Sequence, residues 1–267
     1  MKAKGKVVVV TGAGSGIGRA LALELIRRGA TVAAVDLNER TLAETVELAG
    51  AGASIAPFVL SVADRAAVEA LPDAVIARFG AVDGVINCAG IIQPFVKLAA
   101  LDYATIERVF AVNWLGVLYM TKSFLPHLAA RPEAHVVNVS SMGGFLPVPG
   151  QTVYGASKAA VKLLTEGLWA EMAGTKVGVT VVLQGSTRTN IAENSGIDVS
   201  ALAAAAGSRQ RKLLTAEESA SAIVAGMERK AYRVVLGDAS LMDKLYRLMP
   251  ERATAIIANQ MKDLLKG

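Results

Sequence analysis

A tyrosine and a lysine four residues apart, Tyr154 and Lys158, carry side chains suited to proton transfer. Residues spaced by four lie on one face of a helix, so both side chains can reach the same site. A phenol has an unperturbed pKa of about 10, and a nearby ammonium favours the phenolate and lowers that pKa by about 1–3 units. Ser141 lies thirteen residues before the tyrosine and adds a hydroxyl that can hydrogen-bond a substrate oxygen as charge develops on it. These residues predict general acid–base chemistry on an oxygen atom.

The elements that must position these residues alternate along the chain. Short Val- and Ile-rich runs are separated by stretches with helical periodicity, which is typical of a parallel sheet covered on both faces. The expected strands are 7–10, 31–35, 55–62, 84–87, 136–139, 177–183 and 233–236, and the expected helices are 17–28, 38–48, 64–79, 101–129, 152–172 and 216–230. We therefore expect an α/β fold with a single doubly wound, Rossmann-like parallel sheet. It would form one domain over residues 1–267, with 240–267 as a C-terminal helical tail.

The first expected strand runs into a glycine-rich turn, Thr11-Gly-Ala-Gly-Ser-Gly-Ile-Gly18. Glycines let the backbone turn sharply and approach a pyrophosphate at a helix N-terminus. A tight turn without a ligand explains one or two glycines, whereas four between a Val run and a helix favour phosphate binding. The second strand ends at Asp36, whose carboxylate can accept hydrogen bonds from an adenosine ribose and repels a 2′-phosphate. Neither Ser15 nor Leu37 supplies a cation, so NAD is expected rather than NADP.

Composition narrows the class of protein. Hydrophobic residues make up 53% of the 267 residues and charged residues 19%, which excludes a disordered chain. The net charge of +5 is modest, and its densest basic cluster, 209–212, is interpreted as a solvated loop, so no nucleic-acid partner is expected. Cys88 is the only cysteine, which favours a reducing cytoplasm. No uncharged run is suited to an integral membrane segment, and His127 and His135 lack metal-ligand spacing, so no metal site is expected.

The chain resembles the short-chain dehydrogenase/reductase family from about residue 5 to residue 237. Asn87-Cys-Ala-Gly90 resembles the family's Asn-Asn-Ala-Gly motif, and Ser140-Ser-Met-Gly-Gly144 resembles its serine segment. The thirteen-residue distance to Tyr154 selects Ser141 within that segment, and Asn113 resembles the family's helix asparagine. The resemblance implies a catalytic set of Asn113, Ser141, Tyr154 and Lys158.

The resemblance also implies which residues bind the cofactor. The family's Asp-Val pair after the third strand reads Ser61-Val62 here, and Ser61 is a weaker acceptor for the adenine amine than a carboxylate. The family's Pro-Gly after the sixth strand reads Gln184-Gly185, which loosens the turn. Lys158 would hold the nicotinamide ribose. The expected set is Gly12, Ser15, Gly16, Ile17, Gly18, Asp36, Ser61, Val62, Asn87, Ala89, Gly90, Tyr154, Lys158, Thr187 and Thr189.

The same resemblance places residues 91–95 and 142–148 on the substrate side. Both segments are mostly apolar and predict an apolar pocket with few polar handles. The expected pocket residues are Ile92, Gln93, Met142, Phe145 and Gln151, with the two glutamines as the handles. The loop 190–213 is expected to close over the pocket. The family commonly pairs subunits through its two long helices, which implies a homodimer or homotetramer.

These observations predict an NAD-dependent oxidoreductase that interconverts a secondary alcohol and a ketone on a fairly apolar small molecule. Tyr154 would act as the general acid/base, and Asn113 would support a proton path to solvent. One alternative is an acyl-thioester ketone reductase, which would more often use NADPH. Another is a non-catalytic, NAD-responsive binding module on the same fold. A complete set of four catalytic-type residues argues against the module.

The tail after residue 240 extends past the family motifs. Its apolar residues form two stripes, 241–249 and 256–265, which Pro250 separates. A basic amphipathic helix can lie on a membrane surface. Mixed charges and the lack of aromatic anchors in the second stripe favour packing on the protein instead. We expect the tail to cover the substrate side of its own subunit or of a neighbour.

Overall fold

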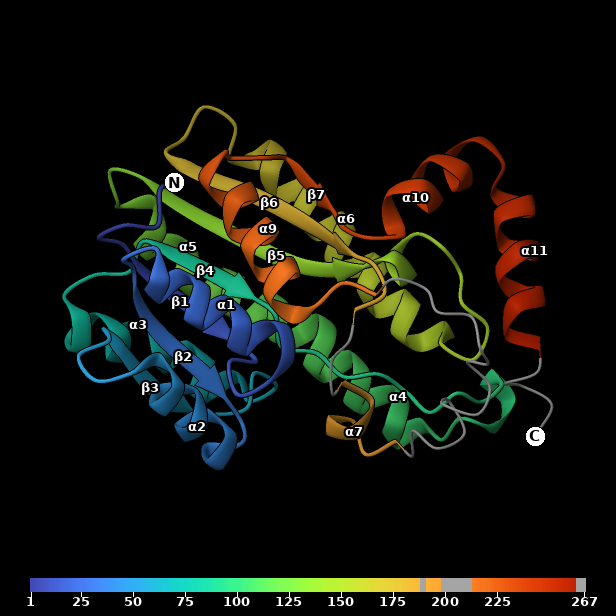
Figure 1. Ribbon diagram of the computed structural model, residues 1–267, viewed down its shortest axis with the longest axis horizontal. Helices are drawn as coiled ribbons and strands as arrows, with labels where there is room; N and C mark the ends of the chain where they lie inside the picture. The colour runs from blue at the N-terminus through green and yellow to red at the C-terminus, as the bar shows by residue number, and fades with distance from the viewer. Residues whose placement is uncertain (188–190, 198–212, 263–267) are drawn as a thin grey trace.

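The computed structural model of the chain describes residues 1–187, 191–197 and 213–262. Within these ranges, seven parallel strands form one sheet in the order β3-β2-β1-β4-β5-β6-β7 (Figure 1). The strands are β1 Val7–Thr11, β2 Thr31–Asp36, β3 Ile55–Val59, β4 Gly84–Asn87, β5 Ala134–Ser141, β6 Val177–Gln184 and β7 Arg233–Val235. Because the strand order reverses between β1 and β4, a crevice opens at their carboxyl ends. The expected doubly wound parallel sheet is confirmed.

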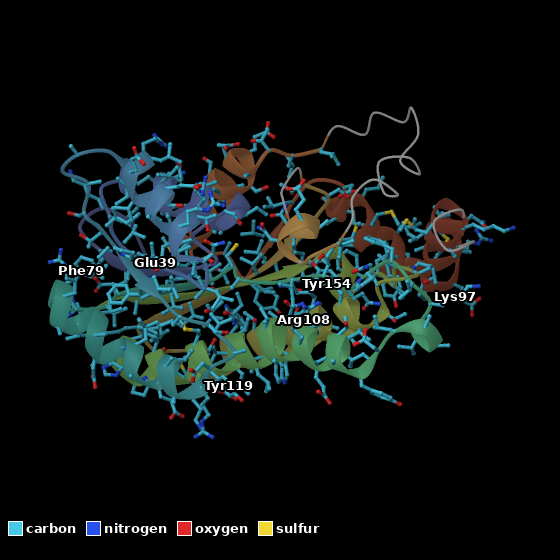
Figure 2. All side chains as sticks on the ribbon, turned by 90° about the horizontal axis from the view of Figure 1, so that it is seen from below. Glu39, Phe79, Lys97, Arg108, Tyr119 and Tyr154 are labelled. Carbon is cyan, nitrogen blue, oxygen red and sulfur yellow. The ribbon has the colours of Figure 1, made fainter. Side chains whose placement is uncertain are left out.

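Helices cover both faces of this sheet. They are α1 Gly16–Arg27, α2 Glu39–Ala49, α3 Arg65–Phe79, α4 Tyr103–Phe110, α5 Gly116–Ala129, α6 Thr152–Glu171, α7 Ile191–Asn194, α9 Ala216–Glu228, α10 Ala239–Leu248 and α11 Pro250–Met261. Leu25 of α1 and Ile223 of α9 belong to the core cluster on one face. Val75 of α3, Phe124 of α5 and Leu168 of α6 belong to the cluster on the other face. Figure 2 shows side chains filling the layers between the sheet and its helices.

Helices α2, α3 and α9 begin at residues that cap their free backbone N–H groups, as their sequences suggest. The side chain of Asn38 accepts a hydrogen bond from the backbone of Thr41 at the start of α2. At the start of α3, Asp64 accepts from Ala67 in the same way. Thr215 and Glu218 form a capping box at the start of α9. These local signals explain why the expected starts of these helices lie within two residues of the observed ones.

The helix expected over 101–129 is interrupted in the structure. A π-helical turn, Ala111–Leu115, separates α4 from α5 and carries the buried Asn113. Just after it, a Cβ atom on Gly116 would lie 2.8 Å from Cγ2 of Val62, so only glycine permits this close approach. Such π turns occur frequently at functional sites.

The strand β3 is shorter than expected, ending at Val59 rather than at residue 62. The carbonyl of Ser61 accepts a hydrogen bond from the backbone N–H of Asp64, which turns the chain towards α3. The Ser61 hydroxyl also accepts from the N–H of Ala63. Ser61 and Val62 therefore lie in a turn beyond the strand, next to the crevice.

The C-terminal helices α10 and α11 lie at one end of the molecule, away from α1, α2 and α3 (Figure 1). They pack against the segment that follows Ser141, where Leu146 is fully buried with Ala253 and Ile257 of α11. Within the described ranges, no helix is both long and apolar enough to span a bilayer. Residues 263–267, which hold the end of the second expected stripe, lie outside the described residues.

Candidate active site

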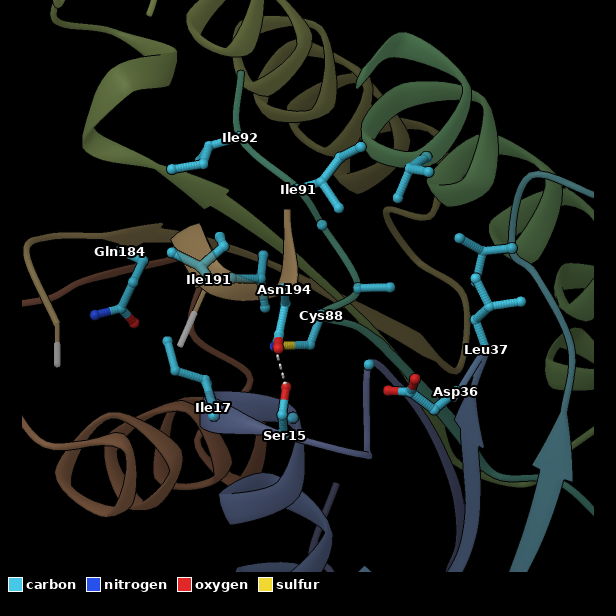
Figure 3. Close-up of a pocket in the computed structure, with 18 of the residues that line it drawn as sticks. Ser15, Ile17, Asp36, Leu37, Cys88, Ile91, Ile92, Gln184, Ile191 and Asn194 are labelled. Carbon is cyan, nitrogen blue, oxygen red and sulfur yellow. Dashed lines mark hydrogen bonds between the residues drawn. The ribbon is translucent and has the colours of Figure 1, made fainter. Parts of the chain in front are cut away.

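A cavity of about 490 Å³ lies at the crevice between the carboxyl ends of the central strands. This volume falls within the range of about 300–1,000 Å³ that is usual for ligand sites. Figure 3 shows Asp36 and Leu37 at one end, and Gln184 and Ile92 at the other. Its walls come from the glycine-rich turn and from residues 35–38, 60–62, 88–92, 139–141, Tyr154, Lys158, 184–185, Thr187, Ile191 and Asn194. The structure thus brings most of the expected cofactor and catalytic residues together in one cavity.

Within the glycine-rich turn, Gly12, Gly14 and Gly18 leave no room for a side chain. Gly12 has a φ of +71°, and a Cβ atom there would lie 2.9 Å from Cα of Ala89. A Cβ atom on Gly18 would overlap the carbonyl of Gly12. The turn leads into α1, whose first turn contains no acidic residue, so its positive dipole end is not neutralised locally. Bare backbone at a helix N-terminus fits a pyrophosphate.

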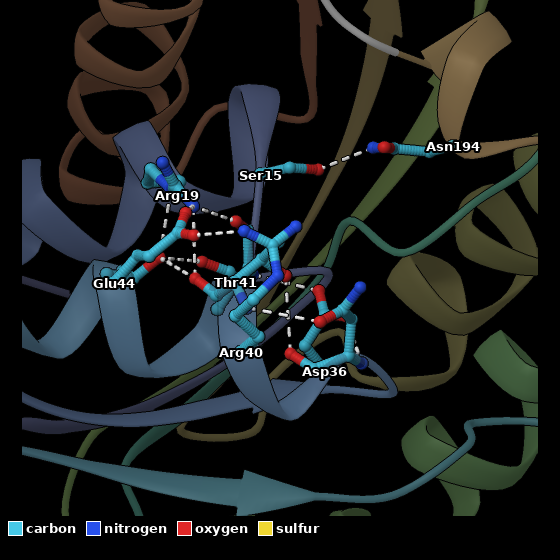
Figure 4. A network of polar contacts seen from close by, with 11 residues as sticks. Ser15, Arg19, Asp36, Arg40, Thr41, Glu44 and Asn194 are labelled. Atoms are coloured by element: carbon cyan, nitrogen blue, oxygen red, sulfur yellow. Dashed lines mark hydrogen bonds and ion pairs between the residues drawn. The ribbon is translucent and has the colours of Figure 1, made fainter.

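The carboxylate of Asp36 is held at the end of β2 by two backbone groups. One oxygen accepts a hydrogen bond from Gly14 N–H at 2.8 Å, and the other accepts from Asn38 N–H at 2.9 Å (Figure 4). A Cβ atom on Gly14 would come 2.9 Å from Cγ of Asp36, so the glycine permits this contact. An ionised carboxylate offers about four acceptor positions. Two acceptor positions of Asp36 therefore remain for hydroxyl groups of a ligand.

The arginines near this end of the cavity are both paired with Glu44. Arg19 lies 3.0 Å and Arg40 lies 2.8 Å from its carboxylate oxygens (Figure 4). Arg19 also donates hydrogen bonds to the hydroxyl of Thr45 and to the carbonyl of Thr41, which joins α1 to α2. The sequence gives no direct signal for this arrangement, because Arg19 and Glu44 lie on different helices.

Lys158 is buried at the end of the cavity that also holds Ser141 and Tyr154. Its ammonium donates a hydrogen bond to the carbonyl of Val139 at 3.0 Å. Burial lowers the pKa of Lys158 to about 8, because desolvation disfavours the charged form. A Cβ atom on Gly90 would lie 3.2 Å from both Nζ of Lys158 and Oδ1 of Asn113, so this glycine leaves space between the two polar groups.

The pKa of the Tyr154 phenol is shifted upwards, whereas the sequence predicts a downward shift. Burial raises this pKa, while a hydrogen bond with Ser141 acts in the opposite direction and is weaker. Ser141 also accepts a hydrogen bond from Gly143 N–H at 3.1 Å, which leaves its hydroxyl proton free to donate. Burial of the phenol dominates this shift, and the hydrogen bond of the Lys158 ammonium goes to the carbonyl of Val139.

Asn113 connects the segment after β4 with the helix that carries Tyr154. Its Oδ1 accepts from Ile91 N–H and its Nδ2 donates to the Ile91 carbonyl, both at 2.9 Å. The same Nδ2 donates to the hydroxyl of Ser157 at 3.0 Å, and that hydroxyl donates to the carbonyl of Tyr154 at 2.7 Å. Three hydrogen bonds therefore fix the buried amide of Asn113.

Residues 6–200 match the family model described as short chain dehydrogenase. The chain belongs to the short-chain dehydrogenase/reductase family. A relative from Mycobacterium tuberculosis, named as the oxidoreductase SadH, is 42% identical over 262 residues, which cover 96% of this chain and 95% of SadH.

Two solved structures show the same fold. A family member from Burkholderia phymatum in complex with NAD is 30% identical with a TM-score of 0.82, and the match covers 93% of this chain and 96% of that one. The 3-ketoacyl-(acyl-carrier-protein) reductase from Brucella melitensis, complexed with NADH, is 25% identical with a TM-score of 0.78, and the match covers 88% and 97%.

The segment 87–90, which resembles the family's Asn-Asn-Ala-Gly motif, contributes both to the sheet and to the cavity wall. Asn87 is buried behind the cavity, where its amide donates to Asn138 Oδ1 at 2.8 Å and to Thr121 Oγ1 at 3.2 Å. Its place as a cavity-lining residue is therefore taken by Cys88, whose pKa burial raises to about 12. The backbone N–H groups of Cys88 and Ala89 both donate to the hydroxyl of Thr11. Asn87 thus supports the sheet rather than facing the cavity.

The turn after β6 is held by a side chain where the family has proline. The amide of Gln184 donates to the hydroxyl of Thr187 at 2.6 Å and to that of Ser219 at 3.2 Å. These bonds link the turn to α9 and partly replace the stiffness of a proline. Thr187 lines the cavity as expected from the family, whereas Thr189 lies outside the described residues.

Two cavity residues on α7 belong to the loop 190–213 that was expected to close over the pocket, although neither was expected by itself as a site residue. Ile191 and Asn194 line the cavity, and the Asn194 amide donates to the hydroxyl of Ser15 at 2.7 Å (Figures 3 and 4). This bond joins the glycine-rich turn to α7 across the cavity. No sequence motif marks it, because the two residues are 179 positions apart.

The expected substrate residues separate into two groups. Ile92 lines the cavity, whereas Gln93, Gln151, Met142 and Phe145 are absent from its walls. The two glutamine side chains are buried and hydrogen-bonded near the start of α6, so they are not polar handles for a substrate. Met142 and Phe145 pack against α10 and α11 instead, and the ring centroids of Phe145 and Tyr246 are 6.3 Å apart.

Proposed function

We propose that this protein is an NAD-dependent oxidoreductase that interconverts a secondary alcohol and a ketone on a fairly apolar small molecule. The single observation that carries the proposal is one continuous cavity with a dinucleotide cradle at one end and Ser141, Tyr154 and Lys158 at the other. This arrangement would place the reactive end of a bound dinucleotide next to an acid–base group. The apolar side chains of Ile91 and Ile92 at the catalytic end suit an apolar substrate.

The cavity favours NAD over NADP. Asp36 presents a carboxylate where a ribose would lie, and a 2′-phosphate there would be repelled. Leu37 beside it supplies no cation, and Arg40 is already paired with Glu44. The related structures from Burkholderia phymatum and Brucella melitensis hold NAD and NADH. When bound, the nicotinamide would supply or accept the hydride.

We expect wild-type protein to bind NADH at least tenfold more tightly than NADPH, because of the charge repulsion at Asp36. The double substitution Asp36→Ala with Leu37→Arg should narrow or reverse this preference, since it removes the repulsion and adds a cation. Fluorescence titration with the two cofactors measures both affinities. Arg131→Lys, which alters a cation far from the cavity, serves as the matched control. Equal affinities of the wild-type protein for both cofactors would contradict the proposal.

Tyr154 would exchange a proton with the substrate oxygen. In ketone reduction, the neutral phenol donates its proton while the hydroxyl of Ser141 hydrogen-bonds the same oxygen. A raised pKa keeps Tyr154 protonated at neutral pH, which is the form that reduction requires. In alcohol oxidation the phenolate must form, and the charge of Lys158 in the same cavity would stabilise it. The amide of Asn113 holds the helix backbone at Tyr154 through Ser157.

We predict that Tyr154→Phe lowers turnover by about 10²–10⁴-fold, the usual contribution of a general acid or base. NADH affinity should change little, because the ring remains in place. The assay follows NADH absorbance with a panel of secondary alcohols, ketones and 3-ketoacyl thioesters. Tyr103→Phe removes the same hydroxyl at an exposed position and serves as the control. Wild-type turnover in Tyr154→Phe would contradict the mechanism.

The panel also separates the second candidate, an acyl-thioester ketone reductase. The similarity to the reductase from Brucella melitensis, whose structure is complexed with NADH, favours including this candidate. Faster turnover of thioesters than of simple ketones would select it. NADH binding without turnover of any compound would favour the non-catalytic binding module.

A further inference from the structure

We propose that Gln93 is a positioning residue that holds Tyr154 in place from outside its helix, an inference that rests on the function proposed above. Gln93 lies in the segment after β4 and is 0% exposed. Its side-chain oxygen accepts hydrogen bonds from the backbone N–H groups of Val153 and Tyr154, both at 2.9 Å. Its side-chain nitrogen donates to the carbonyl of Gly150 at 3.0 Å. A residue sixty positions upstream therefore caps the catalytic helix at the tyrosine itself.

The helix needs this cap, because its own sequence does not provide one. The first N–H groups of any helix lack partners within the helix. The residue at the N-cap of α6 is Gln151, and its side chain makes no capping hydrogen bond. That side chain reaches back instead, and its nitrogen donates to the carbonyl of Gln93 at 2.7 Å. Each glutamine thus hydrogen-bonds the segment that carries the other. Among the described residues, only the side chain of Gln93 accepts a hydrogen bond from the N–H of Tyr154.

The segment that carries Gln93 is itself fixed. The backbone of Ile91 is bonded to Asn113, and the N–H of Ile92 donates to the hydroxyl of Ser195 at 3.0 Å. Figure 3 shows Ile91 and Ile92 together in the cavity wall. The cap therefore ties the backbone of Tyr154 to the wall that faces the reaction. A misplacement of about 1 Å can reduce a reaction rate by about 10²-fold, so the contact bears on turnover as well as on folding.

The test replaces Gln93 with methionine, which has a similar length but no strong acceptor. We expect Gln93→Met to lower kcat by about 10–100-fold, with the Kd for NADH within threefold of wild type. Backbone amide exchange at Val153 and Tyr154, measured by NMR, should accelerate by about tenfold or more relative to wild type. Gln93→Glu keeps the acceptor oxygen, so the two amides should stay protected and kcat should fall less than in Gln93→Met. This second variant keeps the test decisive where the methionine variant folds poorly.

Asp102→Ala is the matched control, because it removes the side-chain cap of another helix, α4, at an exposed position outside the cavity walls. Its kcat should stay within threefold of wild type. The inference is overturned by wild-type kcat in folded Gln93→Met, by protected amides in that variant, or by an equal loss of kcat in Asp102→Ala. Wild-type turnover in Tyr154→Phe would instead refute the proposed function. Loss in Tyr154→Phe together with full activity in Gln93→Met refutes the positioning role alone.

Discussion

The imidazole of His135 is buried in β5, with its Nε2 2.8 Å from the hydroxyl of Thr180. That hydroxyl donates to the carbonyl of Ala231, so it must accept from His135, whose proton therefore lies on Nε2. Nδ1 is buried and has no hydrogen-bond partner among the described residues. Burial lowers the pKa of His135 to about 3, with the positive N-terminal amine and Lys230 acting in the same direction. The folded protein thus holds this ring neutral.

A neutral buried histidine makes stability depend on pH. In the unfolded chain the ring takes up a proton below about pH 6.5, whereas the folded ring does so only near pH 3. Between these values the unfolded state binds more protons, so the free energy of unfolding falls as the pH falls. His135→Gln, which can keep the bond to Thr180, removes this term. Between pH 7 and pH 5 we expect wild type to lose about 2 kcal/mol more than the variant.

Urea unfolding at the two pH values measures this difference. Other groups titrate in both proteins, so their contributions cancel in the comparison. An identical loss of stability in wild type and His135→Gln would contradict the prediction. Burial also raises the pKa of Tyr154 and lowers the pKa of Lys158.

At the scale of elements, α10 and α11 lie beyond the family motifs and cover the segment that follows Ser141. Their inner side chains bury Leu146, which lies five residues after Ser141. Their outer side leaves Leu241 and Leu248 exposed. The cover lies on Met142 and Phe145, so it stiffens the segment that begins at the proposed catalytic serine. We propose that this tail shapes the substrate side of its own subunit.

Deleting residues 240–267 should raise KM for the substrate or weaken subunit assembly, because it uncovers the segment around Leu146. NADH affinity should stay nearly intact, since α10 and α11 contribute nothing to the described walls of the cavity. Steady-state kinetics, fluorescence titration and light scattering measure the three effects. Leu241→Ser with Leu248→Ser, which alters only the exposed side, is the control. Flotation of intact protein with anionic vesicles, lost on deletion, would favour the membrane-surface interpretation instead.

For the whole molecule, the decisive feature is the position at which the strand order reverses, between β1 and β4. Connections from β1 and β4 leave towards opposite faces, so a crevice opens at the carboxyl ends of these two strands. The two core clusters share this one sheet, which supports our proposal that the chain folds as one domain.

The homodimer or homotetramer expected from the family stays a prediction. Trp169 and Tyr232, packed at 4.8 Å between ring centroids, are both partly exposed.

The sequence alone determined the features that depend on neighbouring residues. β-branched runs predicted the strands, and side-chain caps such as Asn38 predicted where helices begin. The glycine-rich turn and Asp36 follow the same logic, because a positive φ and a strand end are local properties. For this reason the fold and most residues around the cavity could be predicted from spacing and pattern.

The tertiary structure decided what depends on distant partners. Gln93 was expected to contact a substrate, and only the packing of its segment against α6 shows that its amide caps that helix. The raised pKa of Tyr154 likewise comes from burial by residues far away in the chain. A side chain's type limits the hydrogen bonds it can make, but the fold selects its partner and removes the water. Hydrogen-bond partners and desolvation are therefore properties of the assembled core, whereas periodicity and turns are properties of the chain.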